Sequence, residues 1–160
     1  MTDSSIHEHL LVVGASVVHV AIDQANRPES ISVEVDIDGR RLRGWEEPGW
    51  SDVCFGVDAG VLYWWSARRI VVVTMRPPTV ELEISYDEDI LLAFHLAELG
   101  WLVVGETSLS IVREGIVTSR LEFDEVVAAC RKDGDLVVVD TIDGRTFAVA
   151  LESDGLRLQT

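Results

Sequence analysis

The stretch "GVLYWWSARRIVVV" at residues 60–73 places Trp64 and Trp65 side by side in an apolar run that predicts a β-strand. Successive side chains of a strand point to opposite faces of the sheet, so both tryptophans cannot enter the same one-sided core. Either one tryptophan is exposed as an anchor for a partner, or the sheet is covered on both faces. We favour two-sided cover, because continuous apolar runs are typical of strands buried on both faces.

Two kinds of strand pattern occur along the 160 residues. Residues 29–38 and 79–86 alternate apolar and polar side chains, which predicts strands with one face in water. Other runs are apolar throughout, which predicts burial on both faces; they are 61–65, 70–75, 101–104 and 136–139. Asp-Gly pairs, which favour type I′ hairpin turns, occur at 38–39, 133–134, 143–144 and 154–155.

A four-strand pattern recurs along the chain, with Gly60, Gly100 and Gly134 each opening a similar apolar strand. The segment "DEVVAACRKDGDLVVVDTIDGRTFAVAL" (124–151) resembles the blades of WD-type and quinoprotein-type β-propellers. The resemblance is architectural, covers about two thirds of the chain and carries over no functional residue. It implies an all-β fold of antiparallel four-stranded blade-like repeats, arranged as a partial or small propeller-like stack.

The chain has no linker rich in Pro, Gly or Ser, so we expect a single domain over residues 1–160, with residues 43–52 as an internal loop. The repeats would span 1–44 in degenerate form, then 45–86, 87–123 and 124–160. Closure of a propeller typically takes about four to eight blades. An open stack completed by a second chain, or a two-sheet β-sandwich, is equally consistent with these strands.

Two segments also carry helix signals. Residues 87–99 begin with acids, are rich in Leu and Ala, and are followed by Gly100. Residues 124–132 begin with an Asp and are followed shortly by Gly134. If both segments are helices, the fold is α+β.

The charge balance restricts the classes of partner. The sequence has 28 acids against 13 bases, a formal net charge of −15. This excludes a nucleic-acid backbone, which needs a basic face, and disfavours an anionic membrane. It suits a basic partner, although acidity also serves solubility alone. The chain has no secretory signal or membrane-spanning stretch, and its lone Cys54 and Cys130 suggest reduced, buried thiols, so we expect a cytoplasmic protein.

Catalytic patterns are absent from the sequence. It has no nucleophile elbow, phosphate-binding loop or zinc-binding helix motif. His7 and His9 share a strand face and could hold a metal, but no recognisable spacing completes a ligand set. We therefore expect no catalytic residue, no metal and no cofactor, with a small carboxylate- and histidine-dependent enzyme as an alternative.

The favoured hypothesis is a non-catalytic acidic protein-binding domain, in its sharpest form a bacterial immunity or antitoxin-like protein that captures a basic partner. Carboxylates would steer association and an aromatic side chain would anchor it. The acids should then share one side of the molecule. The alternative is a structural or self-assembly β module whose exposed edges pair in a homo-oligomer. The candidate partner-binding residues are Trp45, Glu46, Glu47, Trp50, Asp87, Glu88, Asp89, Asp124 and Glu125.

Overall fold

The computed structural model describes residues 6–25, 27 and 29–159, which form sixteen β-strands and no helix. Among these residues there is accordingly no helix long and apolar enough to cross a membrane. The strands are β1 (Ile6–Val13), β2 (Ser16–Asp23), β3 (Ser30–Ile37), β4 (Arg40–Pro48), β5 (Cys54–Asp58), β6 (Val61–Ser66), β7 (Arg69–Met75), β8 (Pro78–Ser85), β9 (Ile90–Leu96), β10 (Gly100–Gly105), β11 (Ser108–Arg113), β12 (Ile116–Glu122), β13 (Val127–Asp133), β14 (Leu136–Thr141), β15 (Thr146–Glu152) and β16 (Gly155–Leu158).

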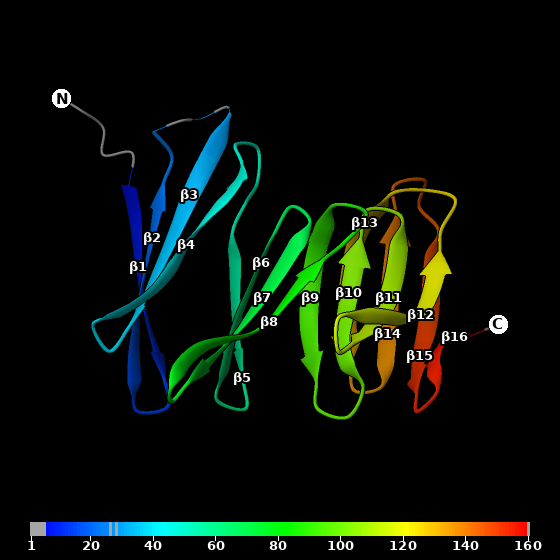
Figure 1. The fold of residues 1–160 in the computed structure, drawn as a ribbon. Helices are drawn as coiled ribbons and strands as arrows, with labels where there is room; N and C mark the ends of the chain where they lie inside the picture. Colours follow the sequence, from blue (N-terminus) through cyan, green and yellow to red (C-terminus); the bar gives the residue numbers. More distant parts are fainter. Residues whose placement is uncertain (1–5, 26, 28, 160) are drawn as a thin grey trace. The chain divides into compact units, whose positions relative to one another are not determined.

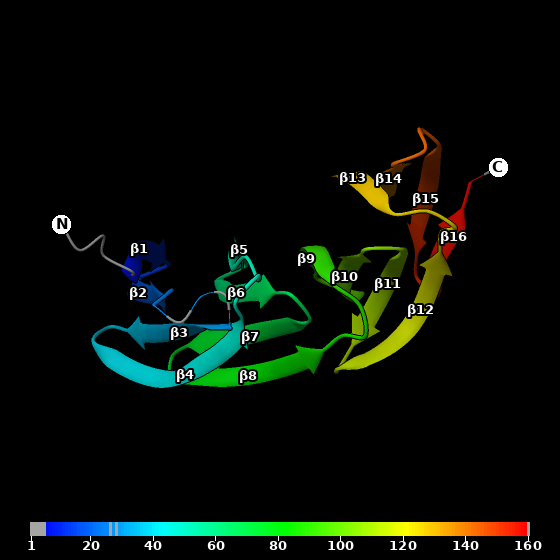
Figure 2. The ribbon, with the colours of Figure 1, turned by 90° about the horizontal axis from the view of Figure 1, so that it is seen from above.

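The strands pair in chain order into four separate four-stranded antiparallel sheets, β1–β4, β5–β8, β9–β12 and β13–β16 (Figure 1). Viewed from above, the strands of each sheet follow one another in sequence order (Figure 2). The expected all-β fold of antiparallel four-stranded blade-like repeats is confirmed. Four sheets of this kind also differ from a single two-sheet sandwich.

The helix alternative is wrong for both segments. Residues 87–99 contain β9 and residues 124–132 contain most of β13. Their helix propensity is overridden by strand pairing, with Ala93 opposite Val103 and Cys130 opposite Val139. The glycines that resembled helix stops belong to hairpins: Gly100 follows the β9–β10 turn, Gly134 lies in the β13–β14 turn, and both have positive φ.

The strands divide into two compact units, one ending at Ile84 and the other beginning at Ser85. Each unit contains two sheets. In the first unit, the β1–β4 and β5–β8 sheets share a core in which Trp64 contacts Trp45 edge-on, with ring centroids 4.7 Å apart. In the second unit, the β9–β12 and β13–β16 sheets share a core that includes Leu102, Ile111 and Val149. A single domain over 1–160 stays a prediction.

Trp64 and Trp65 are both buried, at 1% and 9% exposed. Trp64 enters the core of the first unit, whereas Trp65 lies on the opposite face of β6, where its ring stacks on Tyr63 at 6.0 Å. The next strand, β7, is also buried on both faces from Ile70 to Val73. Two-sided burial, predicted from the continuous runs, therefore holds at β6 and β7.

The run 136–139 departs from this prediction. Val137 and Val139 are fully buried, but Leu136 is 38% exposed and Val138 is only half-buried. One face of β14 is therefore covered and the other is open in the described structure. Apolar content alone therefore does not tell which face of a sheet is covered.

Tight turns close the hairpins. Asp38 and Gly39 both have positive φ, as the predicted type I′ turn requires, whereas at 133–134, 143–144 and 154–155 only the glycine does, so the type I′ prediction is wrong there. Both residues of Ala59-Gly60 and of Glu114-Gly115 also have positive φ, although neither pair contains an Asp. In these turns glycine at the second position is the common signal.

The two cysteines are free and half-buried, so they are less enclosed than the sequence predicted. Burial raises the pKa of Cys54, with a further contribution from the charge of Asp52. Burial also raises the pKa of Cys130 to about 11. Both thiols are therefore mostly protonated at neutral pH.

Trp64→Ala tests the core of the first unit. Because Trp64 is almost fully buried against Trp45, its removal should lower the free energy of unfolding by about 3–5 kcal/mol. Urea unfolding monitored by circular dichroism measures this. Trp50→Ala is the matched control, since Trp50 is 60% exposed and should change stability little. Equal effects of the two substitutions would contradict the assignment.

Candidate functional site: an acidic rim on the second unit

Four connections of the second unit, residues 87–89, 106–107, 123–126 and 142–145, form a continuous band that we call the acidic rim. They join β8 to β9, β10 to β11, β12 to β13, and β14 to β15. Hydrogen bonds link each connection to the next, so the rim is one surface. The bonds run from Thr107 N–H to Glu88 Oε2 (2.7 Å), Phe123 N–H to Thr107 O (2.8 Å), Val127 N–H to Glu106 O (2.8 Å) and Ile142 N–H to Val126 O (2.9 Å).

The rim carries many more carboxylates than bases. Apart from Glu88, its acids are exposed or half-exposed, and the side chain of Asp124 is 93% exposed. Arg145 is the only base within the rim ranges. A negatively charged surface of this kind attracts cations over roughly one Debye length, about 8 Å at physiological salt. The acids of the rim are Asp87, Glu88, Asp89, Glu106, Asp124, Glu125 and Asp143.

Glu88 differs from its neighbours because its carboxylate is engaged inside the unit. Its side chain is 12% exposed. It accepts hydrogen bonds from the backbone N–H of Thr107 and from the hydroxyls of Thr107 and Ser108. A Cβ at Gly105 would lie 2.3 Å from the carboxyl carbon of Glu88, so only glycine leaves room for this contact. Glu88 therefore holds the β10–β11 turn.

Asp87 is paired with Arg120 of β12. The Arg120 Nη1 donates to both carboxylate oxygens of Asp87 at 2.9 Å, and its Nη2 lies 3.1 Å from Glu88. The guanidinium lies over the ring of Tyr86 at 5.6 Å. Burial opposes the charge of Arg120, but the Asp87 hydrogen bond and the nearby charges outweigh it and raise the pKa of Arg120. Because Arg120 also pairs with Glu88 and Glu122, it offsets the charge of Asp87 only in part.

Arg145 makes two acidic contacts at the other end of the rim. Its Nε donates to Asp143 at 2.6 Å, and its Nη1 lies 3.9 Å from Asp124. A hydrogen bond from the Thr141 hydroxyl, together with Arg145, lowers the pKa of Asp143. Asp143 is therefore ionised at neutral pH, and Asp124 is only loosely paired.

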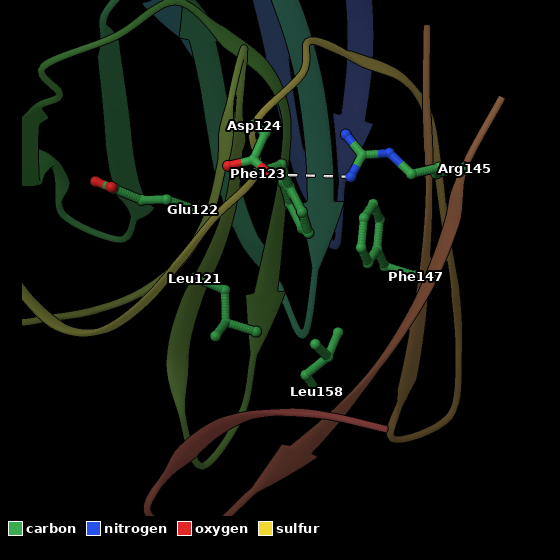
Figure 3. A pocket seen from close by; sticks show the side chains of 7 residues that line it. All are labelled: Leu121, Glu122, Phe123, Asp124, Arg145, Phe147 and Leu158. Carbon is green, nitrogen blue, oxygen red and sulfur yellow. Dashed lines mark ion pairs between the residues drawn. The ribbon is translucent and has the colours of Figure 1, made fainter. Parts of the chain in front are cut away.

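A small pocket of about 100 Å³ opens next to Asp124. Figure 3 shows the rings of Phe123 and Phe147 facing each other, and their centroids are 5.1 Å apart. The Arg145 guanidinium reaches toward Asp124, while Glu122 points away. The pocket combines an apolar lining with charges at its mouth. It is lined by Leu121, Glu122, Phe123, Asp124, Arg145, Phe147 and Leu158.

The remaining sequence candidates lie in the first unit, and two of them are buried. The expected loop over 43–52 is wrong up to residue 48, because β4 extends to Pro48. Strand alternation then turns Trp45 and Glu47 inward, at 3% and 4% exposed. Neither is available to a partner as the structure stands. Glu46 points outward and accepts a hydrogen bond from Ser32 at 2.6 Å.

Glu47 is tied to the β6–β7 turn. Its Oε1 lies 3.3 Å from Arg69 Nε. Burial raises the pKa of Glu47, and its polar neighbours Ser66 and Arg69 only partly offset this effect. Trp50, in the turn after β4, is the exposed aromatic among the candidates.

The structure therefore brings 87–89 and 124–125 together on the acidic rim. Glu46, Glu47 and Trp50 belong to the other unit, so the common side expected for all three acidic clusters stays a prediction. Sequence reasoning missed the pocket, because Phe123 and Phe147 come from separate sheets and read as ordinary core residues. His7 and His9 are exposed in β1, and no group of three or more potential ligands in the described part of the chain could hold a metal.

The sequence matches no protein-family model and no curated protein. Solved structures of β-propeller proteins do match. Hsv2 of Kluyveromyces marxianus is 10% identical with a TM-score of 0.53, over 98% of this chain and 51% of that one. Hsv2p of Kluyveromyces lactis is 13% identical with a TM-score of 0.51, over 97% and 50%. The chain has the fold of β-propeller blades.

A further structure, HIRA(644–1017), is 13% identical with a TM-score of 0.48, over 94% of this chain and 52% of that one. The chain thus spans about half the length of the propeller structures that it matches. The expected blade-like resemblance is confirmed, and it concerns the fold alone.

Glu88→Ala tests the role of Glu88 in the turn. Removal of a carboxylate that accepts several hydrogen bonds should lower the free energy of unfolding by about 1–3 kcal/mol, since the partners lose their acceptor. Chemical denaturation measures this. Glu106→Ala is the control, because Glu106 is exposed on the same rim and should have little effect. If Glu88→Ala left the free energy of unfolding unchanged, the turn would not depend on this carboxylate.

Glu47→Gln tests the buried acid. Because the folded-state pKa of Glu47 lies above 4.5, the native state binds more protons than the unfolded state above that pH. The contribution of Glu47 to wild-type stability should then be greatest at low pH and fall as pH rises through the raised pKa. The difference between the unfolding free energies of wild type and Glu47→Gln should therefore change with pH across this range. The same difference for the exposed Glu46→Gln control should change less. A constant difference between wild type and Glu47→Gln would refute the raised pKa.

Proposed function

We propose that the chain is a non-catalytic protein-binding module that captures a basic partner through the acidic rim of its second unit. The observation that carries this proposal is the pocket at Phe123 and Phe147, which opens beside the exposed Asp124. An apolar cavity accepts an apolar side chain, and the adjacent carboxylate favours a Lys or Arg next to it. The fitting partner surface is therefore an apolar residue flanked by basic residues.

The contrast between closely paired and loosely paired acids supports the same conclusion. Asp87 and Glu88 are occupied by Arg120, whereas Glu106, Asp124 and Glu125 lie exposed or half-exposed nearby. Acids of this second kind keep their charge available for steering a cationic partner. Trp50 offers an aromatic anchor on the first unit, since tryptophan side chains recur among the dominant contacts of interfaces.

In its specific form, the proposal is a bacterial, cytoplasmic immunity or antitoxin-like protein that neutralises a basic toxin. The formal net charge of −15 supports an electrostatically steered association of this kind. The carboxylate- and histidine-dependent enzyme has no comparable observation in its favour, because the described carboxylate with a raised pKa, Glu47, is buried against Arg69.

A charge reversal on the rim tests the proposal. The triple variant Glu106→Lys, Asp124→Lys and Glu125→Lys should lose a basic partner that the wild type retains in a pull-down from cell extract. With the purified partner, the association rate of the wild type should fall as salt is raised, because exposed charges are screened.

The matched control is Glu98→Lys, Asp135→Lys and Asp154→Lys, three exposed acids in turns at the opposite ends of the same sheets. It changes the net charge by the same amount and should keep the partner. Equal loss in both triples would show that net charge matters and the rim does not. An association rate independent of salt would also contradict the proposal.

A further inference from the structure

The outer face of the β13–β16 sheet is apolar at its centre. The inner face, with Val137, Val139 and Val149, belongs to the core of the second unit. On the other face, Val138 lies opposite Ala148, and Leu136 lies opposite Ala150. A sheet face in water normally carries polar residues on its central strands. This face instead has the composition of one that another sheet covers.

The outer face of the β1–β4 sheet also carries exposed apolar side chains. Leu10 and Val12 of β1 are 69% and 71% exposed, and Val17 of β2, opposite Val12, is 46% exposed. Strict alternation places them on the side away from the core of the first unit, which contains Val18 and Val20. This sheet thus has an apolar strip over its first two strands that its own unit leaves uncovered.

The two open faces are of complementary types. In the first unit, β1–β4 packs on the sheet that follows it, and in the second unit, β13–β16 packs on the sheet that precedes it. If the blade repeat is regular, each sheet has one face that meets its predecessor and one that meets its successor. The face left open on β13–β16 is the one that meets a successor, and the face left open on β1–β4 is the one that meets a predecessor.

Charges at the margins of the two faces are paired within each sheet. Arg131, opposite Val138, pairs with Asp140, and Arg157, opposite Ala150, pairs with Glu152. On β1–β4, Glu34 pairs with Arg41. Because these charges are compensated on their own face, the apolar centre is what each face offers to a partner.

We propose that the outer face of β13–β16 packs on the outer face of β1–β4 of a second copy of this chain. Strand spacing and rise give each face about 400 Å², so one contact buries about 800 Å² in total. This is less than the roughly 1,200–2,000 Å² of a stable interface. If each of two copies packs both of its outer faces on the other copy, the pair has two such contacts. Their total buried area reaches that range, so the expected assembly is a closed dimer.

This contact does not use the acidic rim, so it can fail or succeed independently of the proposed function. The two also respond oppositely to salt. Two copies with a net charge of −15 each repel one another, and screening reduces the repulsion. Pairing of copies should therefore strengthen as salt rises, whereas capture of a basic partner should weaken.

Sedimentation velocity of the full chain over a range of concentration and salt tests the proposal. The wild type should shift from monomer to dimer, and more readily at high salt. Two face variants should stay monomeric: Leu10→Glu with Val12→Glu on the first sheet, and Leu136→Glu with Ala148→Glu on the last. The matched control, Ile116→Glu with Val117→Glu, alters exposed apolar residues of β12 and should still pair.

A mixture of the two face variants provides the sharpest test. Each variant retains the face that the other has lost, so the mixture should recover a heterodimer joined by one contact, weaker than the wild-type dimer. Thermal melting confirms that each variant folds. Should a face variant fail to fold, Arg131→Glu with Arg157→Glu replaces the variant of the last sheet, because both arginines are exposed.

Three results would overturn the proposal. One is a wild type that stays monomeric at every concentration and salt. Another is a pair of face variants that dimerise as well as the β12 control. The third is a mixture that, at the highest concentration and salt, contains no more dimer than either variant alone, which would exclude the head-to-tail pairing of these faces.

Discussion

The fold depends on the requirement that apolar sheet faces be covered. A four-stranded sheet with apolar side chains on both faces cannot be stable alone, because burial of apolar surface is the main favourable contribution to folding. Trp64 lies on one face of β6 and Trp65 on the other, and both are buried, so this sheet is covered on both faces at that strand. Sheets of this composition must stack, and blade-like repetition is the simplest chain path that provides a neighbour for each sheet.

The sequence was sufficient for the class of fold and for most strands, because runs such as 70–73 and the alternation in 30–37 are strong periodic signals. It was less informative about which sheet faces are left uncovered within each unit. Residues 136–139 read as buried on both sides, yet Leu136 and Val138 face outward. Helix propensity in 87–99 also misled, since cross-strand pairing with β10 decided the outcome.

The candidate site was harder to predict, because it depends on contacts between distant segments. Acid clusters are visible in the sequence, but the Arg120 pairing of Asp87 and the inward orientation of Glu47 are not. Phe123 and Phe147 meet only because two sheets pack. Glu47, near the end of β4, contacts the β6–β7 turn of the sheet that packs on it, whereas Glu88, just before β9, holds the β10–β11 turn of its own unit. A share of the acidity is therefore committed to contacts inside each unit.

The tight turns Asp38-Gly39 and Glu114-Gly115 lie at the opposite ends of the strands from these carboxylate contacts. A Cβ at Gly39 would meet no atom within 4 Å, so the backbone there is open to solvent. Asp38 itself is bonded to β2, since it donates its N–H to Val17 O and accepts a hydrogen bond from Val17 N–H. Short solvent-facing turns are where chains tolerate inserted segments. Extra residues after Gly39 would therefore leave the β1–β4 sheet undisturbed as long as Asp38 keeps its place beside β2.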